Sequence, residues 1–224
     1  MKMLIGEFGN NHLGDLDVAK EYIRIGRESG CTHVKGQAFL AKDMSGSMPN
    51  SFYQQCQFSF DEYVELIEYG DEIGIPVFFS IFSRQMESLS YHQQWHKIAG
   101  AQAKLNFNDI SKKDTLRTII SIPEFSILPP VRKAHILYVT PYMAADPKLS
   151  TILFFKEYYG REVGLSCHSI GIDSALKAIA DFDIPILEKH FTLDKNIIHK
   201  GKIFRDSVHG CTPKELETLA GELR

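Results

Sequence analysis

Eight short apolar runs alternate with segments of helical length along the whole chain, and this alternation limits the fold more than any other feature. Apolar runs of this length, bounded by turn residues, are typical of strands buried on both faces of a parallel sheet. Parallel strands joined by helices build an α/β protein, and eight of them favour closure into a (β/α)8 barrel. The predicted strands are Lys2–Phe8, Thr32–Phe39, Pro76–Phe82, His96–Gln102, Arg117–Ile122, Ala134–Thr140, Glu162–His168 and Ile184–Phe191.

The segments between and after these strands carry the predicted helices. An open, doubly wound sheet is the alternative fold, but no Gly-x-Gly-x-x-Gly run follows the first strand to support it. Residues 121–135 are too few for a normal connecting helix and include three prolines, so we expect the barrel to be shortened around its fifth βα unit. We therefore predict that residues 1–224 form a single domain, an α/β protein of the (β/α)8 TIM-barrel type. The predicted helices are Asp17–Glu28, Asp61–Ile73, Arg84–Gln93, Lys148–Tyr159, Asp173–Asp181 and Pro213–Leu223.

Composition excludes several classes of protein. With 224 residues, a formal net charge of −3 and 44% hydrophobic residues, the chain has enough apolar material for one packed domain. A nearly neutral charge gives no reason to expect nucleic acid or an anionic membrane surface as a partner. No apolar run approaches the about 20 residues of a membrane span, and the first residues lack the pattern of a signal peptide. The four cysteines are scattered, with no Cys-x-x-Cys pair, so we expect a cytoplasmic protein.

Polar side chains close the last two predicted strands. Ser166 and His168 share one face of the seventh strand, and Glu188 and His190 share one face of the eighth, because side chains alternate along a strand. Neighbouring strands lie about 4.8 Å apart, so imidazoles at their ends can bind one ion. This arrangement predicts a metal-assisted active site.

Other polar residues occur at the carboxyl ends of the remaining strands, where (β/α)8 barrels carry their chemistry. A lysine inside an apolar barrel strand is costly unless it meets an anion. Two such lysines among several hydroxyl groups predict a pocket for a phosphate or a carboxylate. The residues at these strand ends are Glu7, Lys35, Gln37, Ser80, Lys97, Gln102, Ser121, Thr140 and Tyr142.

Five segments resemble motifs of the sialic acid synthase family and follow each other in that family's order. The resemblance spans nearly the whole chain and covers the barrel domain, without the C-terminal antifreeze-like domain that most members add. It implies that phosphoenolpyruvate condenses with an N-acylated hexosamine such as N-acetylmannosamine. The product would be a nine-carbon, sialic-acid-like keto sugar acid for surface polysaccharides, formed with release of phosphate. The five segments are Glu7–Asp15, Val34–Gln37, Lys97–Gly100, Val163–Gly171 and Glu188–Asp194.

The resemblance also implies roles for individual residues and a homodimer. It places a divalent metal, typically Mn²⁺ with Mg²⁺ or Co²⁺ as alternatives, on His168 and His190. The residues that match catalytic positions facing the sugar are Glu7, Gln37, Glu188 and Asp206. The residues that match the phosphoenolpyruvate site are Lys35, Ser80, Lys97, Ser121, Thr140, Tyr142 and Ser166.

Departures from the family pattern leave two alternatives open. Cys167 stands where the family usually has an Asp before the metal-binding His, and by alternation its side chain is expected to point away from His168. One alternative is a non-catalytic family member that binds a metal or a sugar phosphate. The other is a synthase that uses phosphoenolpyruvate with a different aldose. We expect structural rather than functional roles for the histidines outside the motifs, namely His33, His92, His96, His135, His199 and His209.

Overall fold

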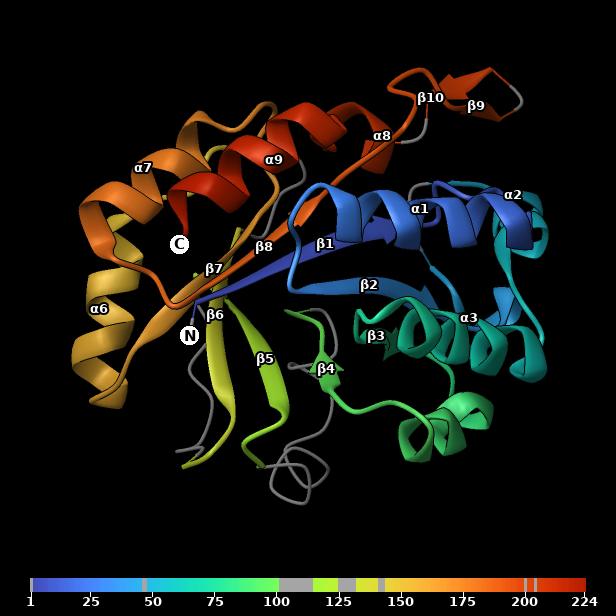
Figure 1. The fold of residues 1–224 in the computed structure, drawn as a ribbon, viewed down its shortest axis with the longest axis horizontal. Coiled ribbons are helices and arrows are strands. Elements are labelled where there is room, and N and C mark those ends of the chain that lie inside the picture. The colour runs from blue at the N-terminus through green and yellow to red at the C-terminus, as the bar shows by residue number, and fades with distance from the viewer. Residues whose placement is uncertain are drawn as a thin grey trace.

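The computed structural model of the protein describes residues 2–45, 48–100, 115–124, 132–140, 144–199, 201–203 and 205–224. Eight parallel strands close into a barrel in chain order, with helices around the outside, which confirms the predicted (β/α)8 fold (Figure 1). Closure is made by β1 and β8, which pair in parallel from Met3 opposite Ile186 to Glu7 opposite His190. The strands are β1 (Met3–Gly9), β2 (His33–Ala38), β3 (Val77–Ile81), β4 (His96–Ile98), β5 (Thr118–Pro123), β6 (His135–Val139), β7 (Val163–Cys167) and β8 (Ile186–His190).

The helices follow the sequence prediction closely. The prediction of a helix at residues 84–93 is refined, because this segment is the 3₁₀ helix η2 (Arg84–Tyr91). Its buried residues, Met86 and Leu89, are three apart, which suits the three-residue turn of a 3₁₀ helix. The predicted shortening around the fifth βα unit falls partly on residues 125–131, which lie outside the described residues. The predicted helices are observed as α1 (Leu16–Glu28), α3 (Phe60–Ile73), α6 (Ser150–Tyr159), α7 (Asp173–Phe182) and α9 (Pro213–Glu222).

The structure also contains short elements that the sequence pattern did not predict. Two of them, η1 (Ala41–Asp43) and α2 (Asn50–Cys56), follow β2. After β8 the chain forms a two-stranded antiparallel sheet of β9 (Ile198–His199) and β10 (Lys202–Ile203), which projects from the barrel, and then the short helix α8 (Arg205–His209) (Figure 1). In the described part of the chain, no helix is both long and apolar enough to cross a membrane.

Local sequence signals begin and end the outer helices. The side chain of Asp15 accepts a hydrogen bond from the Val18 backbone at the start of α1. Capping boxes start α3 and α9, the second with a proline at its first turn. In each box a hydroxyl and a glutamate satisfy backbone groups that the first turn leaves unpaired. Gly74 ends α3 in the left-handed conformation, at φ 80°, which costs glycine little.

The interior of the barrel is divided into an apolar layer and a polar layer. Near the amino ends of the strands, a buried cluster of Ile5, Phe78, Ile119, Leu137 and Ile186 packs inside the barrel. Side chains two positions further along a strand point to the same face, so the next inward layer lies toward the carboxyl ends. That layer is polar on β1, β3, β5 and β8, and the apolar cluster therefore forms the floor of a polar site.

Candidate active site at the carboxyl end of the barrel

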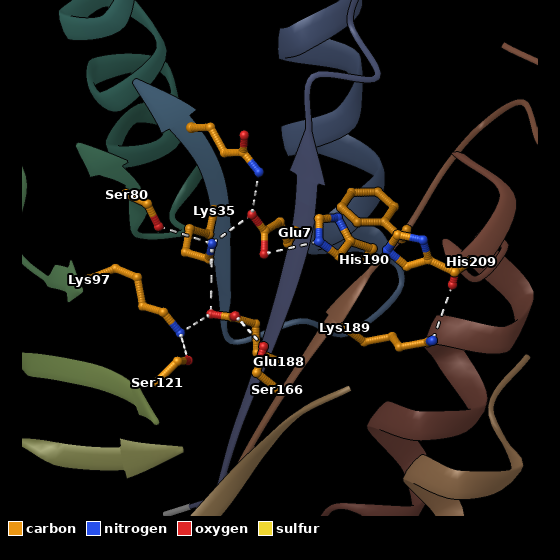
Figure 2. Close-up of polar contacts among 12 residues, drawn as sticks. Glu7, Lys35, Ser80, Lys97, Ser121, Ser166, Glu188, Lys189, His190 and His209 are labelled. Atoms are coloured by element: carbon orange, nitrogen blue, oxygen red, sulfur yellow. Dashed lines mark hydrogen bonds and ion pairs between the residues drawn. The ribbon is translucent and has the colours of Figure 1, made fainter. Parts of the chain in front are cut away.

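Four charged side chains form the polar layer directly above this apolar floor. Glu7, Lys35, Lys97 and Glu188 come from β1, β2, β4 and β8, and each is between 2% and 6% exposed (Figure 2). Side chains this deeply buried lose their contact with water, so the charged form is stable only when charges of opposite sign surround it. The sequence prediction that these four residues face one site is consistent with this arrangement.

The four charges alternate in sign and are linked by short contacts. Lys35 Nζ lies 2.7 Å from Glu7 Oε1 and 3.8 Å from Glu188 Oε2. Lys97 Nζ lies 2.8 Å from Glu188 Oε2. Glu188 therefore joins two lysines that come from different strands, and the cluster of two ammonium and two carboxylate groups has no net charge. This neutrality offsets the cost of burying four ions together.

Hydroxyl and amide groups complete the coordination of these charges. Lys35 donates a hydrogen bond to Ser80 Oγ at 3.3 Å, and Lys97 donates one to Ser121 Oγ at 2.7 Å. Ser166 Oγ donates to Glu188 Oε1 at 2.8 Å, so both oxygens of that carboxylate are occupied. These three serines come from β3, β5 and β7, so strands from all around the barrel contribute side chains to the site.

Gln37 extends the network toward the loop after β1. Its Nε2 donates to Glu7 Oε1 at 3.4 Å, and its Oε1 accepts from Asn10 Nδ2 at 3.3 Å. The predicted catalytic pair of Glu7 and Gln37 is thus in direct contact.

The pKa values of these groups reflect a balance between burial and pairing. Burial alone would raise the pKa of Glu7 and of Glu188, but the neighbouring lysines hold both below their usual range. Burial would lower the pKa of Lys35, yet the Glu188 and Glu7 carboxylates raise it. For Lys97, burial prevails and the pKa is lowered, because Lys35 opposes the attraction of Glu188. Both glutamates are therefore ionised at neutral pH, and Lys97 is the lysine that releases its proton more readily.

Three imidazoles gather beside the charged layer. The ring centroids of His168 and His190 are 5.3 Å apart, and that of His209 lies 5.7 Å from His168 and 4.8 Å from His190. His190 Nε2 is 3.5 Å from Glu7 Oε2, which joins the imidazoles to the charged cluster. The predicted pair of His168 and His190 therefore does lie together at the ends of β7 and β8.

The chemistry of this imidazole group suits a divalent metal. Burial lowers the pKa of His168 to about 4, and burial together with the other two rings puts the pKa of His190 well below its usual value. Both rings are therefore neutral at physiological pH, which is the form that binds metals. Among the described residues, Nδ1 of His168 and Nδ1 of His190 have no hydrogen-bond partner although both atoms are buried. Buried, neutral nitrogens without partners fit the divalent ion that the sequence resemblance implies.

Asp206 and His209 bring α8 into the site. Asp206 is buried, and burial together with Glu7 raises its pKa to about 7. Atoms of Asp206, His190 and His209 that could ligate a metal all lie within 4.8 Å of one another. Sequence reasoning predicted Asp206 and missed His209, which it treated as structural. The signal that could have found His209 is its spacing of three residues from Asp206, which puts both on one face of a helix.

Two residues of the last motifs point away from this site. Lys189 is fully buried, and its Nζ donates hydrogen bonds to the backbone oxygens of Ser169 and of His209, the latter at 3.1 Å. Figure 2 shows it extending toward the His209 backbone, away from Glu188. Cys167 belongs to the apolar core outside the barrel, with its Sγ 3.1 Å from Ser169 Oγ. The expectation that Cys167 points away from His168 agrees with this position.

Of the remaining predicted residues, the structure describes only Thr140. Thr140 directly follows β6 and is buried. Tyr142 lies outside the described residues, as does Gln102 beyond β4.

Comparisons with known proteins agree with this picture. Residues 133–224 match the NeuB family. The human N-acetylneuraminate-9-phosphate synthase is 25% identical over 99% of this chain and 69% of its own length. The N,N'-diacetyllegionaminic acid synthase of Campylobacter jejuni is 26% identical over 99% of this chain and 75% of its own.

Solved structures support the fold. The N-acetylneuraminic acid (sialic acid) synthetase of Leptospira borgpetersenii superposes with a TM-score of 0.85 at 24% identity, covering 99% of this chain and 82% of that one. A truncated 3-deoxy-D-arabino-heptulosonate 7-phosphate synthase of Thermotoga maritima has the same fold, with a TM-score of 0.70 at 12% identity, covering 99% of this chain and 85% of that one. Over nearly its whole length the chain is therefore similar to synthases of sialic and legionaminic acids, and its residues 133–224 match the NeuB family.

Proposed function

We propose that this protein condenses phosphoenolpyruvate with an N-acylated hexosamine to form a nine-carbon, sialic-acid-like keto sugar acid and inorganic phosphate. The names of its relatives support this reaction class, since they are synthases of sialic, legionaminic and pseudaminic acids. The observation that carries the proposal is the pair of buried lysines at the carboxyl end of the barrel. Each lysine is positioned by a serine hydroxyl and balanced by a glutamate.

The lysines are the groups that would bind the anionic substrate. Lys35 and Lys97 would contact the phosphate and carboxylate oxygens of phosphoenolpyruvate. In the structure, the carboxylates of Glu7 and Glu188 are the anionic partners of these lysines. The hydroxyls of Ser80, Ser121 and Ser166 lie within the same network and can donate to those oxygens. Thr140 and Tyr142 are proposed as further contacts of this substrate.

The proposed chemistry balances without any redox partner. The C3 atom of phosphoenolpyruvate forms a carbon–carbon bond to the aldehyde carbon of the open-chain sugar, and the aldehyde oxygen takes a proton to become a hydroxyl. Water adds to C2 of the enolpyruvyl unit, the bond between C2 and the phosphate oxygen breaks, and phosphate leaves as the keto group forms. The lysine ammonium groups stabilise the negative charge of the departing phosphate.

The acidic residues would act on the sugar and on the protons. Glu7, Gln37, Glu188 and Asp206 are proposed to face the acceptor, where their oxygens can accept hydrogen bonds from sugar hydroxyls. Glu188 is ionised and hydrogen-bonded to Lys97, so this pair can hold or pass the proton that the aldehyde oxygen needs. A divalent ion, typically Mn²⁺, bound by His168 and His190 would supply Lewis-acid polarisation of the aldehyde oxygen.

The experiment that tests this proposal measures phosphate release from phosphoenolpyruvate by the full chain with a divalent metal. A panel of N-acylated hexosamines is compared with aldoses that lack the N-acyl group, and the product is identified by mass. Phosphate release that depends on the N-acylated sugar, with a keto acid nine carbons long, is the expected result. Glu188→Gln should abolish it, whereas Lys20→Met, which removes a surface ion pair with Glu65 and a contact with the Tyr69 ring, should not.

Two results would overturn the proposal. Turnover only with a sugar lacking the N-acyl group would assign the chain to a different aldose. Binding of phosphoenolpyruvate and metal without turnover on any sugar of the panel would favour the non-catalytic alternative.

A further inference from the structure

Three buried side chains of types that can bind metals meet at the edge of the site where α8 folds over the end of β8. They are His190, Asp206 and His209, and their potential ligand atoms lie within 4.8 Å of one another. Figure 2 shows the rings of His190 and His209 next to each other, on the side of the site away from Lys35 and Lys97. Two donors at about 2.1 Å from one ion are at most about 4.2 Å apart, so small side-chain rotations would bring all three onto a single metal.

The space between these donors is kept open by Gly9. A Cβ atom added at this position would lie 3.1 Å from Asp206 Oδ2 and 3.5 Å from His190 Nδ1. Gly9 has φ 52°, a left-handed conformation that residues with a side chain adopt at a cost. Gly9 therefore faces Asp206 Oδ2 and His190 Nδ1, and because it has no side chain the space between these two atoms stays open.

The hydrogen-bonding surroundings select which nitrogen of His190 is available. Its Nε2 faces Glu7 Oε2 at 3.5 Å, and a carboxylate beside one ring nitrogen favours the proton on that nitrogen. The lone pair is then on Nδ1, which has no hydrogen-bond partner among the described residues. A histidine whose other nitrogen faces a carboxylate is the usual arrangement of metal-ligating imidazoles.

The backbone of His209 is held by the side chain of Lys189. The ammonium group of Lys189 donates to the backbone oxygen of His209 at 3.1 Å and also to that of Ser169. One buried lysine thus ties α8 to the end of β8 and to the loop after β7, which carries His168. The ring of His209 lies beside that of His190, with the two centroids 4.8 Å apart.

We propose that His190 through Nδ1, Asp206 and His209 form a three-residue metal site, a set of two imidazoles and one carboxylate that prefers a transition metal such as Zn²⁺, Co²⁺ or Fe²⁺. Imidazole nitrogens suit these ions better than they suit Mg²⁺ or Mn²⁺, so on this point the site differs from the Mn²⁺ that the family resemblance implies. Two histidines and a carboxylate are also a common ligand set of catalytic metal sites. This site deepens the metal centre of the proposed function by adding Asp206 and His209 to it, but its existence does not depend on the reaction.

The test is a titration of the chelator-treated full chain with Zn²⁺, Co²⁺ and Mn²⁺, with visible absorption of Co²⁺ as the readout of the ligand set. We expect one ion per chain. His209→Ala and Asp206→Asn should each weaken Zn²⁺ binding by more than about 10-fold and change the Co²⁺ spectrum. Loss of the imidazole should weaken Zn²⁺ binding more than Mn²⁺ binding. The matched control is His92→Ala, which removes an exposed imidazole packed against Phe60 and should change nothing.

His209→Gln, which keeps the approximate size of the side chain, serves as a second variant should the alanine variant fail to fold. Unchanged Zn²⁺ affinity and an unchanged Co²⁺ spectrum in a folded His209 variant would overturn the site.

Phosphate release is measured separately, so this inference and the proposed function can fail independently. Sugar-dependent turnover by a His209 variant with normal metal binding would overturn the three-residue site and leave the reaction standing. The expected metal effects without any turnover would support the site and count against the reaction.

Discussion

Replacing Lys97 by methionine is expected to lower the free energy of unfolding by about 3 kcal/mol. The substitution keeps the length of the side chain but removes the ammonium group that lies 2.8 Å from Glu188 and 2.7 Å from Ser121. Removing one partner of a buried ion pair costs about 3–5 kcal/mol, because the other charge stays buried. Glu188 keeps Ser166 at 2.8 Å and Lys35 at 3.8 Å, which places the cost at the lower end of that range.

The loss of unfolding free energy in Lys97→Met should depend on pH, in a direction set by the pKa of Glu188. Burial alone would raise the pKa of Glu188, but Lys35 and Lys97 hold it below its usual value. A carboxyl group with a lowered folded pKa stabilises the fold above its unfolded pKa, about 4.3, and this contribution is lost as the pH falls through the folded pKa. Without Lys97 the effect of burial prevails and the folded pKa rises. The defect of the variant should therefore be small near pH 4 and grow toward pH 7.

The assay is urea unfolding of both proteins at a series of pH values, supported by thermal unfolding at pH 7. A loss of about 3 kcal/mol corresponds to a fall of about 6–12 °C in Tm for a chain of this size. The control is Lys20→Met, whose partly exposed pair with Glu65 should contribute less than about 1 kcal/mol. The double variant Lys97→Met/Glu188→Gln should recover part of the stability, because the uncompensated charge is gone. Strict additivity of the two single changes, or a defect that is constant with pH, would refute the reasoning.

Three further predictions concern neighbouring parts of the site. Lys35→Met should raise the KM for phosphoenolpyruvate by about 10- to 100-fold through the loss of a charged contact, as measured by initial rates of phosphate release; an unchanged KM would argue against its anion-binding role. Gly9→Ala should destabilise the fold by about 1–2 kcal/mol, because of the left-handed backbone, and should also weaken metal binding by crowding Asp206; unaltered metal affinity in titrations would contradict the proposed opening. Lys189→Met should cost about 2–4 kcal/mol of unfolding free energy, since the backbone oxygens of Ser169 and His209 lose a buried donor; unchanged urea unfolding would show that neither bond matters.

The polar layer of the barrel could be predicted because it depends on local periodicity. Alternation along a strand puts Glu7 on the same face as Ile5, and Ser80 on the same face as Phe78, whatever the neighbouring strands do. The same rule placed His168 and His190 at the ends of adjacent strands. The positions of the outer helices followed from caps and apolar spacing, apart from η2, where burial of residues three apart favoured the tighter 3₁₀ turn.

The pairing of these groups could not be predicted, since it depends on contacts between distant segments. Lys97 and Glu188 are 91 residues apart and come from β4 and β8, and only the closed barrel with its particular register brings them to 2.8 Å. His209 shows the same limit, because no strand periodicity applies to a five-residue helix that reaches the site only by folding back over β8.

From the sequence alone, the eight strands and the kinds of polar group near their carboxyl ends could be predicted. These properties follow from the two-residue period of a strand and from the cost of burying unpaired polar groups. The three-dimensional contacts were needed to see which lysine neutralises which glutamate, that Lys189 anchors α8, and that a third imidazole lies beside the other two. Those contacts arise from barrel closure and from the docking of α8, which bring together side chains that no local pattern relates.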